Sequence, residues 1–418
     1  MAHTSEQPPV RMDQIMEEML PDERCWDPGK PWQAGWMYNA TSFHDVRRIL
    51  TDQSAFSLDV PGNDPDDPEG SLVLGGYWTQ PWPQHKELEE VVGPQFRPPQ
   101  KIERRFGPVT QQVLDTHVDN LLEAGDDTFD FASTVGRIPA EIISAYAGVD
   151  ANDALVKQWV TDANLVQESP EQKRRMSELL GGVLENCEDT LPSGAVLEDA
   201  QDVVQALVIA MRNKHPVLGK PLSRNWAVGQ LAMVIAAGDD TTGTTLGTAL
   251  QAFTLYGKMD DIRQRNVQQM DVATQEVIRR YPAFPRGFGV ALHEVELGTD
   301  DARIVVPKGA TVAAWMSAAN HDASRFDDPY DFAVDRRPNP HLGLGAGARY
   351  CTGVYLAKHI LNHTLSGLAQ RLPGLEWDGQ PVTRRHGEYI SVQSIPEGGM
   401  TLGFNVREAR RSAARSPR

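Results

Sequence analysis

Cysteine is scarce in this chain, which has only Cys25, Cys187 and Cys351 among its 418 residues. Three widely spaced cysteines do not make a disulfide framework, and they suit a reducing compartment better. Long hydrophobic runs are missing too: no stretch approaches the roughly 20 apolar residues that span a bilayer, and residues 1–20 lack the continuous apolar core of a signal peptide. We therefore expect a cytoplasmic protein without a membrane segment.

An excess of positive charge is also absent, because the formal net charge is −17. This balance argues against a general nucleic-acid-binding surface but allows a local basic patch for an acidic protein partner. No Gly/Ser-rich or Pro-rich spacer divides the chain into halves of different composition. We expect one domain over residues 1–418, with residues 1–20 and the basic segment 406–418 as flexible ends.

The order of sequence patterns predicts a mainly α fold with small β-sheets. The first hundred residues are rich in Pro, Gly and Trp, and the turn-rich segment 59–70 predicts a loop. Helical spacing dominates from about 100 to 280, with Gly125 and Gly148 as helix stops and 225–256 as the longest apolar helix. Strand patterns follow at 290–298, 303–315 and 399–406.

The glycine-rich segment 341–353, HLGLGAGARYCTG, precedes a run with helical periodicity. Its glycines permit unusual backbone conformations and a close approach to a flat ligand. Cys351 is expected near a helix N-terminus, where the helix dipole favours a thiolate. Arg349, two residues earlier, is suited to pairing with a carboxylate. A metal-ligating thiolate is therefore the favoured interpretation.

Two simpler interpretations of this segment exist. A lone cysteine is usually a small buried hydrophobic residue, and GLGAG also resembles a dinucleotide-binding turn. The dinucleotide turn requires a preceding strand and a later acidic residue, whereas the prolines of the preceding RRPNPH are unfavourable in a central strand.

The segment resembles the ligand loop of the cytochrome P-450 superfamily, the haem-thiolate monooxygenases, which has the form F-G-x-G-x-[HR]-x-C-x-G. The chain differs at the first position, where Leu344 replaces Phe. It matches at Gly345, Gly347, Arg349, Cys351 and Gly353. The resemblance implies that Cys351 is the axial ligand of the iron in haem b and that these residues contact the cofactor.

A polar notch, Ala237-Gly238-Asp239-Asp240-Thr241-Thr242, interrupts the longest apolar helix. Such a notch is costly in a buried helix unless it serves a purpose, and a helix end or a water-filled kink is the simplest alternative. The notch resembles the family's [AG]-G-x-[DE]-T element. By that resemblance Ala237 and Gly238 leave room for oxygen and substrate, Thr241 hydrogen-bonds dioxygen or its water, and Asp240 relays protons.

Further residues take roles from the same resemblance. Glu276 and Arg279, three apart on one helical face, resemble the structural E-x-x-R pair, with Arg336 as its third partner. His85 and Arg286 are candidates to join Arg349 at the haem propionates, although Glu89 stands where many relatives have Arg. An ordinary surface histidine is the alternative for His85.

The resemblance implies the triangular P-450 fold of the soluble bacterial branch, with haem between the long helix and the Cys351 loop. It also implies insertion of one atom of O2 into a small apolar or aromatic substrate in secondary metabolism. Electrons would come from NAD(P)H through a ferredoxin and its reductase, with Lys358 and Arg349 in the landing site. By analogy the substrate pocket contains Trp78, Val234, Phe284, Phe288 and Ile395, although each can equally be a core residue.

Three other functions remain open at the level of sequence. The first is a peroxide-driven or atypical oxidase on the same scaffold. The second is a haem-binding sensor or carrier without catalysis, against which the Asp240–Thr241 pair argues. The third is a Rossmann-type dehydrogenase, which would bind nicotinamide without haem.

Overall fold

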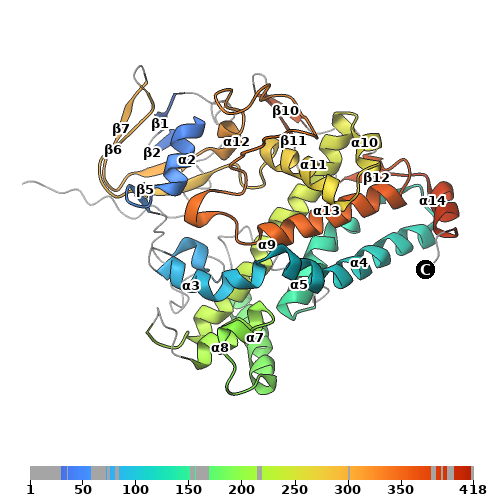
Figure 1. Cartoon of the computed structure of the whole chain (residues 1–418), viewed down its shortest axis with the longest axis horizontal. Helices are drawn as coiled ribbons and strands as arrows, with labels where there is room; N and C mark the ends of the chain where they lie inside the picture. The colour runs from blue at the N-terminus through green and yellow to red at the C-terminus, as the bar shows by residue number, and fades with distance from the viewer. Residues whose placement is uncertain are drawn as a thin grey trace, which may run out of the picture.

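The computed structural model describes residues 30–34, 36–57, 72, 76–80, 84–150, 156, 169–213, 219–299, 302–377, 383–386, 389–392 and 400–415. Within these ranges helices form most of the body, and short strands lie in small sheets towards one side (Figure 1). This confirms the predicted fold class. The segment predicted as a loop, 59–70, lies outside the described residues, as do residues 1–20.

The described helices pack in several layers around one long central helix. Their bounds are α2 Phe43–Thr51, α3 Gln84–Val92, α4 Pro99–Ala124, α5 Ile138–Ala147, α7 Pro170–Thr190, α8 Val203–Arg212, α9 Arg224–Leu255, α10 Met259–Arg263, α11 Val267–Arg280, α12 Met316–Ala319, α13 Val354–Arg371 and α14 Val406–Ala413. Short 3-10 turns occur at η2 Tyr77–Thr79, η3 Gly93–Phe96, η4 Val135–Arg137, η5 Leu197–Asp199 and η6 Gly347–Arg349. No described helix is both long enough and apolar enough to cross a membrane.

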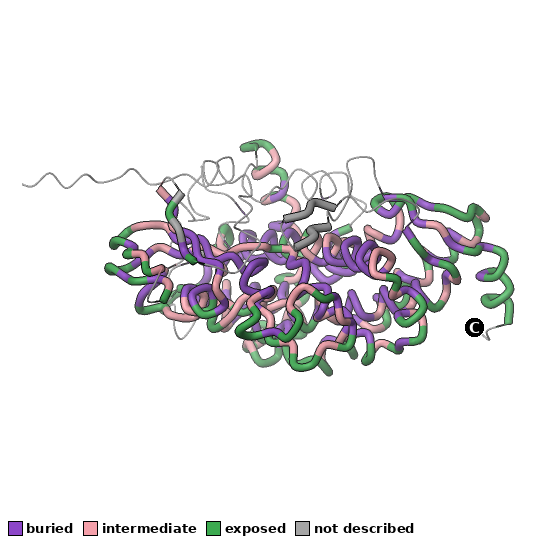
Figure 2. Tube along the Cα trace, turned by 90° about the horizontal axis from the view of Figure 1, so that it is seen from above, coloured by how far each residue is buried: buried purple, intermediate pink, exposed green. Residues whose placement is uncertain are grey.

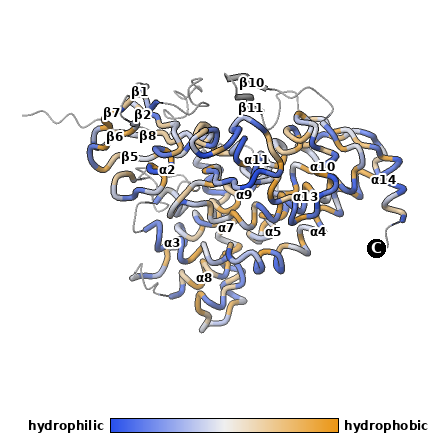
Figure 3. The backbone as a smooth tube through the Cα atoms, turned by 45° about the horizontal axis from the view of Figure 1, so that its top comes forward, coloured by the Kyte–Doolittle hydropathy of each residue, from blue (hydrophilic) through white to orange (hydrophobic). Residues whose placement is uncertain are grey.

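Helix α9 is the central element, and it matches the helix predicted over 225–256. The side chain of Ser223 caps it by accepting a hydrogen bond from the backbone N–H of Trp226. Most residues of α9 are buried, because α5, α7, α8, α11 and α13 pack around it, whereas Ala237 and Asp240 are exposed. Figure 2 shows that buried residues run through the middle of the molecule. A mostly apolar helix belongs in a core, whereas the amphipathic surface helix α4 alternates between hydrophobic and hydrophilic stretches (Figure 3).

The strands form one five-stranded sheet and smaller pairings on the side away from the α7–α8 layer. The larger sheet has the order β1-β2-β8-β5-β3, with β2 parallel to β8 and the other neighbours antiparallel. The strand bounds are β1 Trp32–Ala34, β2 Met37–Ala40, β3 Phe56–Ser57, β4 Thr128–Asp130, β5 Gly287–Ala291, β6 Val295–Leu297, β7 Ile304–Val306, β8 Thr311–Ala314, β9 Glu376–Trp377, β10 Thr383–His386, β11 Tyr389–Val392 and β12 Thr401–Gly403. The three predicted strand regions all contain strands.

Glycine ends two of the helices as predicted. Gly125 after α4 has φ +80°, and Gly148 after α5 has φ +72°. Both occupy the left-handed conformation that terminates helices and favours glycine. The backbone N–H of Gly125 donates to the carbonyl of Leu121, which satisfies one of the free acceptors of the last turn.

The C-terminal segment differs from the prediction. Residues 406–413 form helix α14 rather than a flexible end, and α14 packs on α4 and α13. Val406 and Ala409 are buried, and Nε of Arg410 donates to the carbonyl of Leu122 at 2.7 Å. The many basic residues of this segment favoured the prediction of a solvated tail. Val406 and Ala409 are three residues apart, which is the spacing of neighbours on one face of a helix.

Candidate active site

The Cys351 loop runs from residue 341 to the start of α13. Gly345 and Gly347 have φ +76° and +64°, a conformation that favours glycine. A Cβ on Gly345 would also lie 2.9 Å from the carbonyl oxygen of Arg349, so space and conformation both require glycine there. The N–H of Cys351 donates to the carbonyl of Leu344 at 2.8 Å, which closes the loop.

Cys351 lies just before Gly353, the N-cap of α13. Its thiol is partly exposed, and loss of hydration raises its pKa, while a hydrogen bond from the Gly353 backbone opposes this effect. A thiol in this environment is protonated at neutral pH unless a cation stabilises its thiolate. The position before a helix N-terminus favours the thiolate that a metal ion binds, whereas burial alone favours the thiol.

Arg349 is a half-buried cation whose hydrogen-bond partners among the described residues are neutral. Its guanidinium donates to the carbonyl of Trp78 and, at 2.8 Å, to that of Gln80. Burial lowers its pKa to about 10. No carboxylate of the described residues forms an ion pair with it. Because a buried charge is costly without an opposite charge, this guanidinium suits a carboxylate supplied by a ligand.

His85 lies beside Arg349 and is buried. Its Nε2 is 3.1 Å from the carbonyl oxygen of Ala348, and its Nδ1 is 2.9 Å from that of Tyr77. Burial, followed by the charge of Arg349, lowers its pKa. A neutral imidazole has one N–H, so it can donate to one of these two carbonyls. The structure thus brings His85 to the Cys351 loop, between backbone groups.

The polar notch of α9 does not break the helix, which is continuous from Arg224 to Leu255. Ala237 and Asp240 are exposed, although most of α9 is buried. The hydroxyl of Thr241 donates to the carbonyl of Ala237 at 2.7 Å, which leaves its lone pairs available to accept from another group. Partial loss of hydration raises the pKa of Asp240. These residues form an exposed polar face on a buried helix.

Gly238 packs against α5. A Cβ at this position would overlap Cδ1 of Ile143, so glycine lets α5 approach α9 closely. Successive helical residues point about 100° apart, and Gly238 therefore borders α5 while Ala237 borders the exposed face.

The structure brings the three predicted structural residues together in a buried cluster. Nε of Arg279 is 2.8 Å from Oε2 of Glu276, and Nη2 is 2.8 Å from Oε1. Arg336 lies at 3.2 Å from the same carboxylate. Arg279 also donates to the carbonyls of Asn320, Pro329 and Asp331. The cluster therefore fixes the chain between α12 and the Cys351 loop.

Four of the five predicted substrate residues lie in the described part of the chain. Val234 is buried in α9, and Trp78 packs partly against the main core. Phe284 is 43% exposed, whereas Phe288 packs with Trp315 in the sheet. Arg286 lies over the rings of Phe288 and Trp315, at 5.5 and 5.2 Å from their centroids. Ile395 lies outside the described residues.

Sequence analysis missed a set of polar contacts between α9 and the Cys351 loop. The N–H of Tyr77 donates to Oε1 of Gln230 at 2.8 Å, and its hydroxyl donates to Thr352, next to Cys351. Gln230 is fully buried in the apolar part of α9. The side-chain amide of Gln230, isolated in that apolar run, could have indicated this contact, because buried polar groups need hydrogen-bond partners.

Asp239 is a second acid that sequence analysis did not assign. Burial raises its pKa to about 6, with the charge of Asp240 adding to the effect and Arg137 opposing it. Its neighbour in the helix, Gly238, borders α5. The notch therefore contains one inner and one exposed acid rather than two equivalent carboxylates.

The residues around Cys351 fit an iron porphyrin. Cys351 lies before the N-terminus of α13, where a thiolate ligand is favoured, and half-buried Arg349 suits a carboxylate such as a porphyrin propionate. No described atom outside its immediate neighbours lies within 4 Å of the Cβ that Gly353 would carry, so a flat ligand can approach the backbone there.

Comparison with known proteins agrees with this geometry. The family model for cytochrome P450 matches residues 156–381, more than half of the chain. The steroid C26-monooxygenase of Mycobacterium tuberculosis (strain ATCC 25618 / H37Rv) is 25% identical over 86% of this chain and 82% of its own. The mycinamicin IV hydroxylase/epoxidase of Micromonospora griseorubida is 26% identical over 84% and 85%.

A solved structure supports the same fold. The Bacillus megaterium cytochrome P450 crystallised in complex with testosterone superposes with a TM-score of 0.71 at 18% identity, covering 90% of this chain and 96% of that one. Members of this family bind haem b through a cysteine thiolate. With its fold, its Cys351 loop and the family match in agreement, this chain belongs to the cytochrome P450 family and is a haem-dependent monooxygenase.

Proposed function

We propose that this monooxygenase inserts one atom of O2 into a small apolar or aromatic organic molecule, with electrons from NAD(P)H delivered by a ferredoxin and its reductase. The observation that carries the oxygen-activating part is the exposed face of α9, where Asp240 and Thr241 lie side by side in an otherwise buried helix. When bound, haem b with a thiolate ligand supplies the activation of dioxygen.

Residues of the chain bind the haem and transfer protons. Cys351 supplies the thiolate, and Arg349 and His85 are placed to hold the propionates. Oγ1 of Thr241 orients a water or accepts a proton, because its own proton is used by the carbonyl of Ala237. Asp240 has a raised pKa, so its carboxyl carries a proton more readily near neutral pH than an ordinary surface aspartate.

The substrate class follows from the relatives and from the apolar residues available. Two of the relatives are a steroid C26-monooxygenase and a mycinamicin IV hydroxylase/epoxidase. Trp78 follows Tyr77 directly in the chain. Tyr77 hydrogen-bonds both Gln230 of α9 and Thr352 of the Cys351 loop. We infer that a polycyclic or macrocyclic apolar molecule is bound on this side of α9.

The test begins with the absorption spectrum of the dithionite-reduced protein under carbon monoxide. We expect the strongly red-shifted Soret band of a thiolate complex in wild type and in Cys187→Ser, and its loss in Cys351→Ser. A band at the histidine-ligated position in wild type, or no haem, would overturn the assignment of Cys351.

The second stage is turnover with NADPH, a ferredoxin and its reductase, against a panel of steroids, macrolides and aromatic compounds. Hydroxylated product that depends on all three components and on O2 supports the proposal. Efficient product formation from hydrogen peroxide alone, with none from the electron chain, would show a peroxide-driven enzyme instead. Haem binding without product from either route would indicate a non-catalytic protein.

A further inference from the structure

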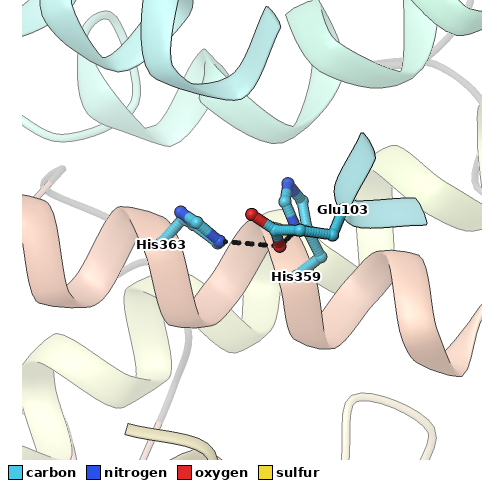
Figure 4. Close-up of side chains that lie close together, drawn as sticks. All are labelled: Glu103, His359 and His363. Carbon is cyan, nitrogen blue, oxygen red and sulfur yellow. Dashed lines mark hydrogen bonds and ion pairs between the residues drawn. The ribbon is translucent and has the colours of Figure 1, made fainter. Parts of the chain in front are cut away.

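A cluster of two histidines and a glutamate lies between α4 and α13, outside the groups assigned above (Figure 4). Glu103 comes from the first turns of α4, and His359 and His363 lie one turn apart on α13. Nδ1 of His359 is 3.0 Å from Oε2 of Glu103, and Nε2 of His363 is 3.3 Å from the same oxygen. We propose that these three residues bind a divalent transition-metal ion of the Zn²⁺ type.

The distances suit tetrahedral coordination. Nitrogen and oxygen ligands lie about 2.0–2.2 Å from zinc, so neighbouring ligand atoms in a tetrahedron lie about 3.3 Å apart. The two contacts of Glu103 already have 3.0 and 3.3 Å. All three ligand atoms lie within 4.8 Å of one another. A small rotation of His363 and Glu103, both at the surface, completes the arrangement.

Histidines four residues apart on a helix are neighbours on one face, and here their ring centroids are 4.3 Å apart. Two imidazolium rings at this separation repel each other, whereas two neutral rings can share one cation. The Glu103 carboxylate supplies the negative charge. A metal ion bound by two neutral imidazoles and the Glu103 carboxylate therefore avoids the repulsion between two protonated rings.

Thr110 hydrogen-bonds the ring nitrogen of His359 that is not proposed to bind the metal. Its hydroxyl is 3.1 Å from Nε2 of His359, the nitrogen that faces away from Glu103. When Nε2–H donates to Thr110, the lone pair of Nδ1 points at the carboxylate, an arrangement that a cation between them stabilises. Metal-ligating histidines commonly use their second ring nitrogen in this way, which fixes the ring orientation.

The composition of the site selects the metal. Two imidazoles and one carboxylate suit Zn²⁺, Ni²⁺ or Cu²⁺, whereas Ca²⁺ and Mg²⁺ prefer oxygen ligands throughout. The side chain of His359 is 5% exposed, that of His363 is 20% and that of Glu103 is 61%. The fourth position therefore opens to solvent and takes water.

Bound metal would tie α4 to α13, two helices that pack against each other. The site lies two turns beyond Cys351 along the chain, and its three side chains are distinct from those assigned to the haem. Metal binding here stands independently of the substrate and of the electron donor.

The test titrates ZnCl2 into the haem-loaded enzyme by calorimetry, after dialysis against a chelator too mild to remove haem iron. We expect one Zn²⁺ per chain for wild type, and binding weakened by about tenfold or more in His363→Ala and in Glu103→Gln. His44→Ala removes a histidine that is 80% exposed and outside the cluster, and it should bind as wild type does.

Thermal unfolding gives a second readout. Zn²⁺ should raise the Tm of wild type and of His44→Ala by a few degrees and leave the two cluster variants unchanged. The carbon monoxide spectrum verifies that each variant is folded and haem-loaded. Equal Zn²⁺ binding by wild type and the cluster variants, or no Zn²⁺ binding by wild type, would show that the cluster is only a hydrogen-bonded surface ion pair.

Discussion

Nε of Arg336 lies 3.2 Å from both carboxylate oxygens of Glu276. The same carboxylate accepts hydrogen bonds from Arg279, from Asn339 and from the backbone N–H of Ala333. The side chains of Glu276 and Arg279 are fully buried. A carboxylate surrounded in this way holds several chain segments at one point, and it is the negative charge that both arginines face.

Glu276→Gln should therefore destabilise the protein strongly. Removing one charge of a buried pair leaves the other uncompensated, at a cost of about 3–5 kcal/mol. Urea unfolding monitored by circular dichroism measures the loss, and the yield of haem-loaded protein should fall with it. Glu296→Gln is the control, because its pair with Arg303 is exposed and should contribute little. Equal unfolding midpoints for the two variants would contradict the role given to this cluster.

Asp240→Asn and Thr241→Ala should each lower the amount of product formed per NADPH consumed. Both remove a group that holds or moves protons on the exposed face of α9, an effect of about 100-fold in typical general acid–base catalysis. We expect substrate binding to persist while product per NADPH falls and hydrogen peroxide rises. Product and peroxide are measured in the same reconstituted reaction. Unchanged coupling in both variants would remove these residues from the proton path.

Asp239→Asn should stabilise the protein, with a clear dependence on pH. The pKa of Asp239 is raised to about 6 from an ordinary 3.8. Between those values the unfolded chain releases a proton that the folded protein keeps, so wild-type stability falls as pH rises and the penalty is complete above about pH 6. The variant avoids this penalty.

At pH 7 we expect Asp239→Asn to be more stable than wild type by about 1–3 kcal/mol, and the gap should shrink by about half at pH 5. Urea midpoints at the two pH values measure it. A gap that does not change with pH would mean that Asp239 titrates as an ordinary surface acid.

Lys358→Glu should weaken use of the ferredoxin if the landing site includes this residue. Nζ of Lys358 is 2.8 Å from Asp271, so part of its charge is already neutralised within the protein. We expect the KM for ferredoxin to rise several-fold, and the difference from wild type to shrink as salt screens the charges. Asp271→Asn is the matched control, because it frees the lysine and should leave KM unchanged or lower it.

Much of this fold was predictable from the sequence because its strongest signals are local. The apolar run of α9 and the glycines at 125 and 148 mark elements whose ends the structure reproduces within a residue or so. The failure at 406–413 is also local. Charge dominated the composition there, while the two apolar positions that dock α14, Val406 and Ala409, carried too little signal.

The site was harder to predict because its contacts join distant segments. The motif around Cys351 contains its own glycines and arginine, so it was visible in one stretch of sequence. The partner of Gly238 is Ile143, and the partners of Tyr77 are Gln230 and Thr352. No periodicity reports such pairings, since they depend on how the helices pack. The same holds for Glu103, which meets His359 only in the folded chain.

Helix α14 has a practical consequence for anyone who purifies this enzyme. The guanidinium of Arg410 donates to the carbonyl of Leu122 near the end of α4, and the backbone N–H of Val406 donates to Oδ1 of Asp127 at 3.3 Å. A chain that ends before Asn405 would lose both contacts, and the carbonyl of Leu122 would lose the donor that α14 provides. A truncated form made for crystallisation should therefore keep α14.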